Sequence, residues 1–361
     1  MPRLSKHEGV GDTVRGKIPS MTRAFGARIH GVDMARLVAA FASSHSIMLT
    51  AEREDWITAF RESDHRVPLF DKRGDPRSYA ELLAAAPADS ETMVTPDKMV
   101  AAHRRTFEAI AALKRRLDAT PLDALIVVGD DQHELFQDAM MPSLAVYYGE
   151  TIRNAAQSAP SEENWFRRAQ MRRQEPGGDV HYPVRADLAL HLVTGLTQRQ
   201  FDVCALQEIP PDAYEGHAYS YIHRTYLEGR SLPVVPVMLN TYYPPNQVTP
   251  VRCVQLGLQL RALIESFAPD IRVGILASGG LSHFVVDEEL DRGVIAALKN
   301  KDLDHLAGLD PRRLQAGSSE IRSWVVTGAA AAGLDFALID YIPAYRTPAL
   351  TGTGLGFAHW S

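Results

Sequence analysis

Short apolar runs recur along the chain and are separated by stretches with helical periodicity. The runs are rich in β-branched and aliphatic residues and show no polar alternation, which is typical of strands buried on both faces. The predicted strands cover residues 37–43, 122–129, 201–206, 234–240, 273–278 and 336–341. Pro236 lies in the fourth strand and argues against full pairing at that residue.

The intervening stretches predict helices. Between Phe107 and Leu117, apolar residues recur at spacings of three and four, with basic residues elsewhere, which indicates an amphipathic helix. Other helices are predicted over residues 187–196, 252–267 and 319–332. The last would begin with Ser318 or Ser319 as N-cap and Glu320 in its first turn. Alternating strands and helices predict a single α/β domain whose central, mostly parallel sheet is covered by helices.

Composition narrows the class of protein. The 361 residues include 45% hydrophobic and 23% charged residues, with a formal net charge of −6. An acidic chain lacks the electrostatic footprint of a nucleic-acid binder. No apolar run approaches the roughly 18 residues that a membrane span requires. Cys204 and Cys253 both lie in apolar surroundings, so we expect free thiols in a cytoplasmic protein.

Residues 1–33 differ from the rest of the chain. They are rich in basic residues and glycine and show no clear periodicity. We interpret them as a flexible N-terminal extension, or as a translated stretch upstream of a start at Met34. A transit peptide is less favoured because acidic residues are present. The folded domain is predicted to cover residues 34–361.

Three histidines share one local context. His45, His133 and His283 each follow an apolar strand after a few small or polar residues. Loops at the carboxyl ends of strands line the ligand crevice of an α/β sheet, so these side chains are expected to converge. A histidine taken singly is more often structural or solvated, and the shared context weakens that alternative.

Several chemistries lack their motifs. No cysteine lies near these histidines, and no G-x-S-x-G elbow or G-x-x-x-x-G-K loop occurs. The TGTGLGF segment resembles a dinucleotide loop, but the chain ends before a helix and an acidic partner can follow. A metal site remains. Two imidazoles and a carboxylate suit Fe(II) in an oxygenase or Zn²⁺ in a hydrolase, and the spacing does not separate the two.

Six motifs in order carry a family resemblance. They are SSH at 43–45, GDDQHELF at 129–136, GHAYSYIHR at 216–224, VVPVMLNTYYPPN at 234–246, SGGLSHF at 278–284 and GSSEIRSW at 317–324. Together they resemble the class III extradiol ring-cleaving dioxygenases, in the lineage of protocatechuate 4,5-dioxygenase catalytic subunits and gallate dioxygenases. The resemblance runs from about Met34 to the C-terminus.

The resemblance implies a site and a reaction. His45, His133 and Glu320 match the family's Fe(II) ligands. His283 matches the acid/base histidine, and His217 matches a pocket histidine that contacts substrate or O₂. The implied reaction is extradiol cleavage of a catechol with insertion of both atoms of O₂, without a nicotinamide or flavin.

Two departures from the family pattern bear on the site. His223 stands where relatives carry a proline, which puts the substrate contact of that loop in doubt. The interval between His45 and His133 is longer than in the protocatechuate enzyme and holds an insertion at about residues 60–100. The insertion is either a built-in lid, replacing the small helical subunit that caps the site there, or a plain surface insertion.

The substrate is inferred by analogy. A carboxylated catechol is expected, with Arg346 and Thr347 holding the carboxylate and Tyr242 stacking on the ring. The alternatives are a structural loop at Arg346 and core packing at Tyr242. Relatives form dimers or larger assemblies, so a homo-oligomer is expected. A zinc hydrolase on the same ligands and a catalytically silent family member are the rival readings.

Overall fold

The computed structural model describes residues 34–157 and 164–361, so the predicted extension at residues 1–33 lies outside the described residues. The described residues form a nine-stranded sheet in the order β11-β13-β1-β10-β4-β9-β5-β8, with β12 paired to β13. Its strands are β1 (Arg36–Ser43), β4 (Ala124–Asp130), β5 (Leu144–Tyr147), β8 (Cys204–Leu206), β9 (Val234–Leu239), β10 (Arg272–Ser278), β11 (His283–Val285), β12 (Phe336–Tyr345) and β13 (Thr351–Trp360).

The centre of this sheet is parallel. Strands β1, β10, β4 and β9 pair in parallel, and antiparallel pairs join β13 to β1 and β5 to β9. The predicted α/β fold with a mostly parallel sheet is therefore confirmed, with antiparallel strands at the flanks as an addition. Pro236 pairs with Val127 of β4, while the ladder to β5 ends at Val237, so the proline is not paired on both sides.

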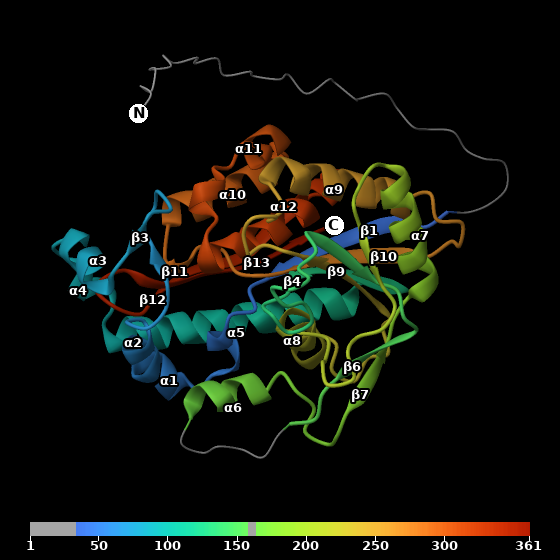
Figure 1. Cartoon of the computed structure of the whole chain (residues 1–361). Coiled ribbons are helices and arrows are strands. Elements are labelled where there is room, and N and C mark those ends of the chain that lie inside the picture. The colour runs from blue at the N-terminus through green and yellow to red at the C-terminus, as the bar shows by residue number, and fades with distance from the viewer. Residues whose placement is uncertain (1–33, 158–163) are drawn as a thin grey trace, which may run out of the picture. The chain divides into compact units, whose positions relative to one another are not determined.

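Helices cover both faces of the sheet (Figure 1). The helices are α1 (Arg53–Ile57), α2 (Ala59–Ser63), α3 (Tyr79–Ala85), α4 (Ser90–Met93), α5 (Pro96–Ala119), α6 (Trp165–Met171), α7 (Ala186–Gln198), α8 (His217–Thr225), α9 (Pro250–Ile264), α10 (Glu288–Asn300), α11 (Leu303–Ala307) and α12 (Ile321–Ala330). Alternate residues of β4 point to opposite faces. Ile126 and Val128 pack in the core beneath α7, α9 and α12, whereas Leu125 and Val127 pack in the core beneath α5 and α8.

The glycine-rich C-terminal segment is the strand β13 and not a nucleotide loop. Its glycines leave room for neighbouring side chains. A Cβ at Gly354 would lie 2.1 Å from the Asp291 carboxylate, and one at Gly356 would lie 2.9 Å from the Trp324 ring. Sequence reasoning missed this strand because glycine is unfavourable in strands unless another group approaches the backbone closely.

The junction before α12 also differs from the prediction. A 3₁₀ turn (Ala316–Glu320) precedes the helix, so Glu320 stands at the helix boundary and not within its first turn. This turn brings Glu320 beside Gly279, where a Cβ would lie 3.1 Å from the Glu320 Cβ.

The segment between His45 and α5 holds the predicted insertion. It contains a 3₁₀ turn (Ile47–Thr50), helices α1 to α4, and a hairpin of β2 (Leu69–Phe70) and β3 (Pro76–Arg77). Leu69 and Leu82 form a small apolar cluster with Ala349, and Phe284 packs against it. The insertion therefore contacts the segment that follows His283, and its role as a lid stays a prediction.

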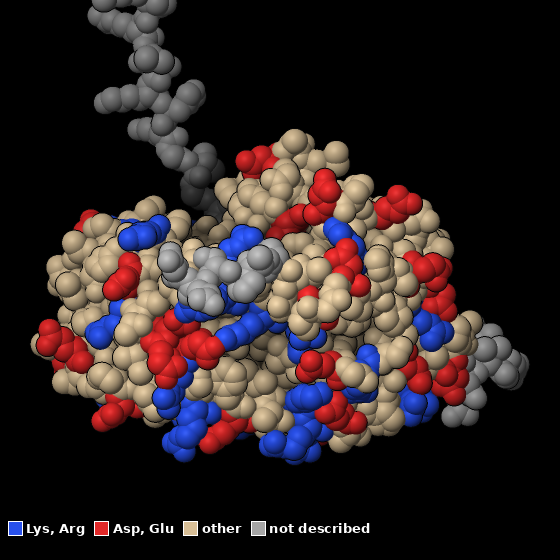
Figure 2. Space-filling model, turned by 90° about the horizontal axis from the view of Figure 1, so that it is seen from below, with Lys and Arg blue, Asp and Glu red and all other residues tan. Residues whose placement is uncertain are grey.

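The surface carries both signs of charge. On the face seen in Figure 2, acidic and basic side chains are interspersed and form no uniformly basic field. Within the described ranges, no helix has the length and apolarity needed to cross a membrane. The remaining short elements are β6 (Thr151–Asn154), β7 (Val180–Pro183) and a 3₁₀ turn (Pro311–Arg313).

Candidate metal centre

The candidate site lies at the carboxyl ends of the three adjacent strands β1, β10 and β4. His45 follows β1 by two residues, Ser278 ends β10 and Asp130 ends β4. Because parallel strands end at the same edge, residues far apart in the chain meet here. The first residue of α8, His217, reaches the same place, since α8 packs against β4 and β10.

Two imidazoles and a carboxylate converge at this edge. The Nε2 atoms of His45 and His217 are 3.2 Å apart, and the Asp130 Oδ1 atom lies 3.7 Å from the first and 3.9 Å from the second. Among the described residues, these three make up the group of histidine, cysteine or acidic side chains whose ligand atoms fall within 4.8 Å of one another. Glu320 adds a second carboxylate, with Oε2 3.2 Å from His45 Nε2.

Hydrogen bonds fix the His45 ring. Its Nδ1 atom is 3.0 Å from the Ser278 hydroxyl, and that hydroxyl donates its proton to the carbonyl of Ala218 at 2.7 Å. The Ser278 oxygen is therefore the acceptor for an Nδ1–H of His45. Nε2 is therefore the His45 nitrogen that faces the cluster, and without its proton it would offer a lone pair to a metal.

A buried carboxylate fixes the His217 ring. Glu134 accepts the backbone N–H of His217 at 2.8 Å, and its second oxygen is 2.8 Å from His217 Nδ1. The preceding Gly216 has φ of +81°, and a Cβ there would lie 3.0 Å from the Glu134 carboxylate. Such carboxylate–histidine pairs orient metal-binding imidazoles in proteins.

The charges of the cluster support cation binding. Burial opposes a positive charge on His217, but the Glu134 and Asp130 carboxylates outweigh it and raise the pKa of His217 to about 9. Burial would raise the pKa of Glu320, but His45 and His283 hold it well below its ordinary value, so this carboxyl is ionised. Burial, and next the Glu320 charge, raise the pKa of Asp130.

The side chains of this cluster are suited to bind a metal ion. The Asp130 Oδ1 atom is buried without a hydrogen-bond partner, which is costly unless a ligand satisfies it. Imidazole nitrogens and carboxylate oxygens are the donors that Fe(II) and Zn²⁺ take in catalytic sites. A divalent cation would replace the proton that otherwise holds the two Nε2 atoms together.

The structure does not bring His133 into this cluster. His133 has φ of +62°, its ring stacks on Tyr243 with centroids 3.8 Å apart, and its Nε2 is 3.0 Å from the exposed carboxylate of Asp138. Its neighbour Gln132 faces the cluster instead, with its amide nitrogen 3.0 Å from Asp130. The His133 Nε2 atom is, like the Asp130 Oδ1 atom, buried without a hydrogen-bond partner among the described residues, so the ligand role of His133 rests on the family resemblance and on this unpartnered nitrogen, not on proximity to the cluster.

His283 lies on the other side of Glu320. Its Nε2 atom is 3.2 Å from Glu320 Oε1, and its Nδ1 is 2.8 Å from the carbonyl of Leu281, which fixes Nδ1 as a donor. Burial lowers the pKa of His283, and the Glu320 charge outweighs this and raises it. The ring can therefore exchange a proton at Nε2. Glu320 lies between this ring and His45 of the candidate metal site.

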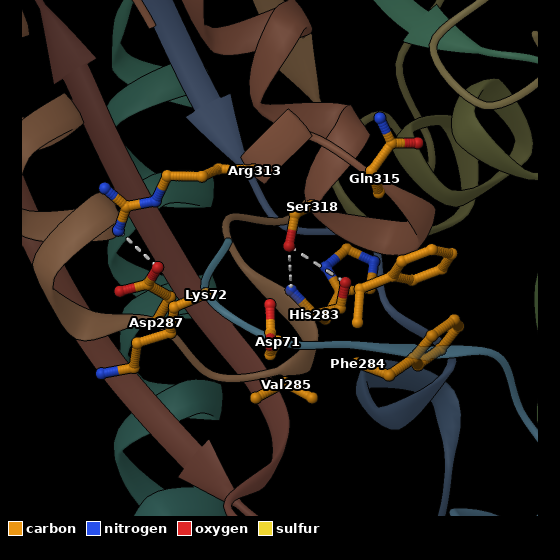
Figure 3. A pocket seen from close by; sticks show the side chains of 10 residues that line it. Asp71, Lys72, His283, Phe284, Val285, Asp287, Arg313, Gln315 and Ser318 are labelled. Atoms are coloured by element: carbon orange, nitrogen blue, oxygen red, sulfur yellow. Dashed lines mark hydrogen bonds and ion pairs between the residues drawn. The ribbon is translucent and has the colours of Figure 1, made fainter. Parts of the chain in front are cut away.

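A pocket opens beside His283 (Figure 3). The hairpin of the insertion forms one wall, so the predicted insertion borders the site. The Ser318 hydroxyl accepts the backbone N–H of His283 at 2.9 Å and holds this loop against the turn that carries Glu320. The lining residues are Phe70, Asp71, Lys72, His283, Phe284, Val285, Asp287, Arg313, Gln315 and Ser318.

The four predicted substrate residues have different surroundings. Tyr242 is half-buried beside the cluster, and burial followed by the Glu320 and Asp130 charges raises its pKa. His223 is buried elsewhere on α8, where its Nδ1 is 2.6 Å from Glu215 and its ring stacks on Tyr182. Arg346 and Thr347 lie in the turn before β13, and their partners are residues of the chain itself.

Sequence reasoning missed the residues that support the histidines. Glu134 and Gln132 flank His133 in the GDDQHELF motif, and Asp131 accepts the backbone N–H groups of Leu135 and Phe136, which shapes this loop. Burial raises the pKa of Asp131 to about 6. The signal was present, because four polar residues directly after a buried strand indicate a site at its end.

Known proteins match this chain in part. Residues 90–349 match the family described as the catalytic LigB subunit of aromatic ring-opening dioxygenase. The chain is 21% identical over 206 residues to a 2,3-dihydroxyphenylpropionate/2,3-dihydroxicinnamic acid 1,2-dioxygenase of Comamonas testosteroni, covering 57% of this chain and 54% of that protein. It is 32% identical over 106 residues to a gallate dioxygenase of Pseudomonas putida, covering 28% of this chain and 30% of that protein.

The length of chain that each match covers decides whether it shows the family. The chain spans about half the length of the first relative and about a third of the second. The family match covers most of the chain and includes His133, His217, His283 and Glu320, while His45 precedes it. The expected resemblance is confirmed: the chain belongs to the LigB family, the catalytic subunits of aromatic ring-opening dioxygenases.

Proposed function

We propose that this protein is a non-haem Fe(II)-dependent extradiol dioxygenase that cleaves a catechol. The observation that carries the proposal is the convergence of the Nε2 atoms of His45 and His217 with the unpartnered Asp130 oxygen, all within 4 Å. Such a group at a sheet edge, in a member of this family, supports a catalytic metal.

We assign His45, His217 and Glu320 as the ligands. These three side chains give the two imidazoles and one carboxylate that hold Fe(II) in oxygenases. The family resemblance implies Glu320, which lies 3.2 Å from His45, while Asp130 forms the more compact group with the two histidines. His133 is the alternative that the resemblance implies, and its contacts with Tyr243 and Asp138 count against it.

The side chains divide the work of the reaction. When bound, a ferrous ion supplies the Lewis acidity that favours loss of the catechol protons and the electrons that activate O₂. His283 accepts a catechol proton at Nε2 and later returns it to an oxygen of the opening ring. The Leu281 carbonyl holds the His283 ring through Nδ1, which leaves Nε2 for proton transfer.

The balance of the reaction needs no further reductant. Both atoms of O₂ enter the product, one ring C–C bond beside the diol breaks, and the product is a semialdehyde acid. Histidine suits this exchange, because its ordinary pKa lies near neutral pH. The Glu320 charge that raises the pKa of His283 in this structure would be neutralised by a bound cation. We assign the ring contact to Tyr242, a half-buried side chain whose pKa is raised by burial and next by the Glu320 and Asp130 charges.

The test is anaerobic purification, metal analysis, loading with Fe(II), and oxygen uptake on a panel of catechols. We expect one iron per chain and the appearance of a yellow ring-opened product. A protein that holds zinc, hydrolyses esters and ignores O₂ would be the rival hydrolase. A protein that binds Fe(II) and catechol without consuming O₂ would be a silent family member.

We also propose three further properties of the protein. They are a homo-oligomer in solution, a cytoplasmic location, and substrates limited to a catechol and O₂, without nucleic-acid or membrane partners. Gel filtration with light scattering tests the first.

A further inference from the structure

The Arg346 guanidinium already holds a carboxylate. Its Nη2 is 2.9 Å from Asp64 Oδ1 and its Nε is 3.0 Å from Asp64 Oδ2, and both side chains are at most 4% exposed. Two parallel N–H···O bonds are the geometry in which arginine recognises a carboxylate in proteins and ligands. Arg346 is therefore a carboxylate-binding residue whose ligand comes from the same chain.

The Asp64 carboxylate is fully engaged. Its Oδ2 also accepts the Thr351 hydroxyl at 2.5 Å, and Thr351 shares a further hydrogen bond of 2.7 Å with Thr347. Asp64 is the C-cap residue directly after α2, in the region of the predicted insertion. The insertion thus supplies the counter-charge for the arginine.

This ion pair contacts segments that lead from two histidines of the proposed site. Arg346 Nη1 is 3.5 Å from the Met48 sulfur, and Met48 follows His45 by three residues. Thr351 pairs with Val285 across the β11–β13 ladder, in which His283 pairs with Thr353. The pair therefore lies between the segment that carries His45 and the strand that begins with His283.

We propose that Asp64 sets the substrate class, because it fills the carboxylate position at Arg346 and so directs the enzyme to catechols with an uncharged ring substituent. The inference rests on the proposed function. A substrate carboxylate would have to displace Asp64 and leave that buried charge unpaired, or lie beside it and be repelled. A methyl or hydrogen substituent meets neither cost.

This inference replaces the expected carboxylated substrate held by Arg346 and Thr347. The relatives named for gallate and for 2,3-dihydroxyphenylpropionate act on carboxylated compounds, but they share little identity with this chain. An alternative cation for such a group is Lys72, which lines the pocket beside His283. The experiment below separates that possibility from the proposal.

The first arm uses the wild-type protein loaded with Fe(II). The probes are 4-methylcatechol and protocatechuate, which differ by a methyl group against a carboxylate on the same ring carbon. We expect kcat/KM to favour 4-methylcatechol by at least about tenfold, which is about 1.4 kcal/mol. A preference for protocatechuate overturns the inference.

Binding of the two probes under argon, measured by calorimetry, gives the same ratio without turnover. If neither probe is oxidised, the proposed function fails. In that case the binding ratio still decides the inference: tighter 4-methylcatechol supports it, and equal or tighter protocatechuate contradicts it.

The second arm changes the ion pair. Asp64→Asn removes the internal carboxylate charge and should shift the ratio toward protocatechuate by about tenfold or more. The matched control is Asp123→Asn, which breaks a bidentate pair with Arg272 at the opposite edge of the sheet. The control should leave the ratio unchanged, and an unchanged ratio in folded Asp64→Asn contradicts the inference.

A double variant covers the case in which Asp64→Asn does not fold. Asp64→Leu with Arg346→Met replaces the buried pair by apolar groups, which proteins often tolerate. We expect it to keep the preference for 4-methylcatechol. A selective loss of protocatechuate turnover would show that Arg346 holds the substrate carboxylate.

If Lys72→Met lowers protocatechuate turnover at least about tenfold more than 4-methylcatechol turnover, the carboxylate is bound at Lys72 and the inference is also wrong.

Discussion

The charged side chains at the two ends of strands β4 and β10 differ in whether their contacts are satisfied within the chain. At the amino end, Asp123 and Arg272 form a bidentate ion pair in which every contact is satisfied within the chain. At the carboxyl end, Asp130 presents an unpartnered buried oxygen to two imidazoles. The same two strands thus end in a closed pair on one side and an open donor set on the other.

This difference between the two ends separates residues that stabilise the fold from residues that are available to bind a ligand. An ion pair whose contacts are all satisfied gains nothing from a cation. A buried carboxylate oxygen without a partner, in contrast, costs free energy until a ligand binds it. Arg346 and Asp64 belong with the satisfied pairs, because the guanidinium binds a carboxylate of its own chain where a ligand carboxylate could bind. The predictions below test each side of this contrast.

The largest effect is expected at Glu320. Glu320→Ala should abolish Fe(II) binding and lower turnover on the order of a thousandfold, because a ligand and its charge are lost. Metal analysis and oxygen uptake measure both. Glu108→Ala, at an exposed carboxylate of α5, is the matched control and should bind metal normally. Full iron retention in Glu320→Ala would remove this residue from the ligand set.

The next effect separates proton transfer from metal binding. His283→Gln should retain Fe(II) and lose about 10²–10⁴ in kcat, the contribution of a general acid/base. Single-turnover kinetics under controlled O₂ measure this loss. Loss of iron from His283→Gln would place His283 among the ligands and contradict the proposed role.

A smaller effect concerns the loop that carries His283. Asp291 accepts hydrogen bonds from Ser282 and Tyr341, and burial raises its pKa to about 6. Because this value lies above the unfolded one, its contribution to stability is full below about pH 4 and is lost as pH rises through about 6. The two-unit shift corresponds to about 3 kcal/mol.

Asp291→Asn should therefore remove this fall in the free energy of unfolding between about pH 4 and pH 6.5. Urea denaturation at a series of pH values, compared with the wild type, measures the difference. Parallel pH curves for the two proteins would show that Asp291 does not carry the dependence.

The smallest effect is expected at the amino end of the sheet. Asp123→Asn breaks the closed pair with Arg272 and should cost about 1 kcal/mol or less, since the pair is partly exposed. Arg272 lowers the pKa of Asp123 to about 2, so its contribution is present above about pH 4 and is lost as pH falls toward 2. Thermal unfolding should shift slightly while iron content stays unchanged. Loss of iron would contradict the division between the two ends.

Much of the fold follows from the sequence pattern. The buried strands β1, β4, β9 and β10 are continuous apolar runs, and their parallel order places His45 at the carboxyl edge. The strand β13 could not be predicted, because its glycines report contacts with Asp291 and Trp324 that form after folding.

The site was harder to predict than the fold because loop conformation decides which neighbour faces inward. Gln132 and His133 are adjacent, yet the positive φ at His133 directs its ring toward Tyr243 while Gln132 reaches Asp130. The partner of Arg346 is 282 residues away in sequence, so no local motif reveals it.

The central claim is that His217, and not His133, completes the metal centre with His45 and Glu320. The most direct test compares Fe(II) bound per chain after anaerobic loading in the wild type, His217→Ala and His133→Ala. We predict about one iron per chain in the wild type and in His133→Ala, and almost none in His217→Ala. Iron lost from His133→Ala and kept by His217→Ala would contradict the claim.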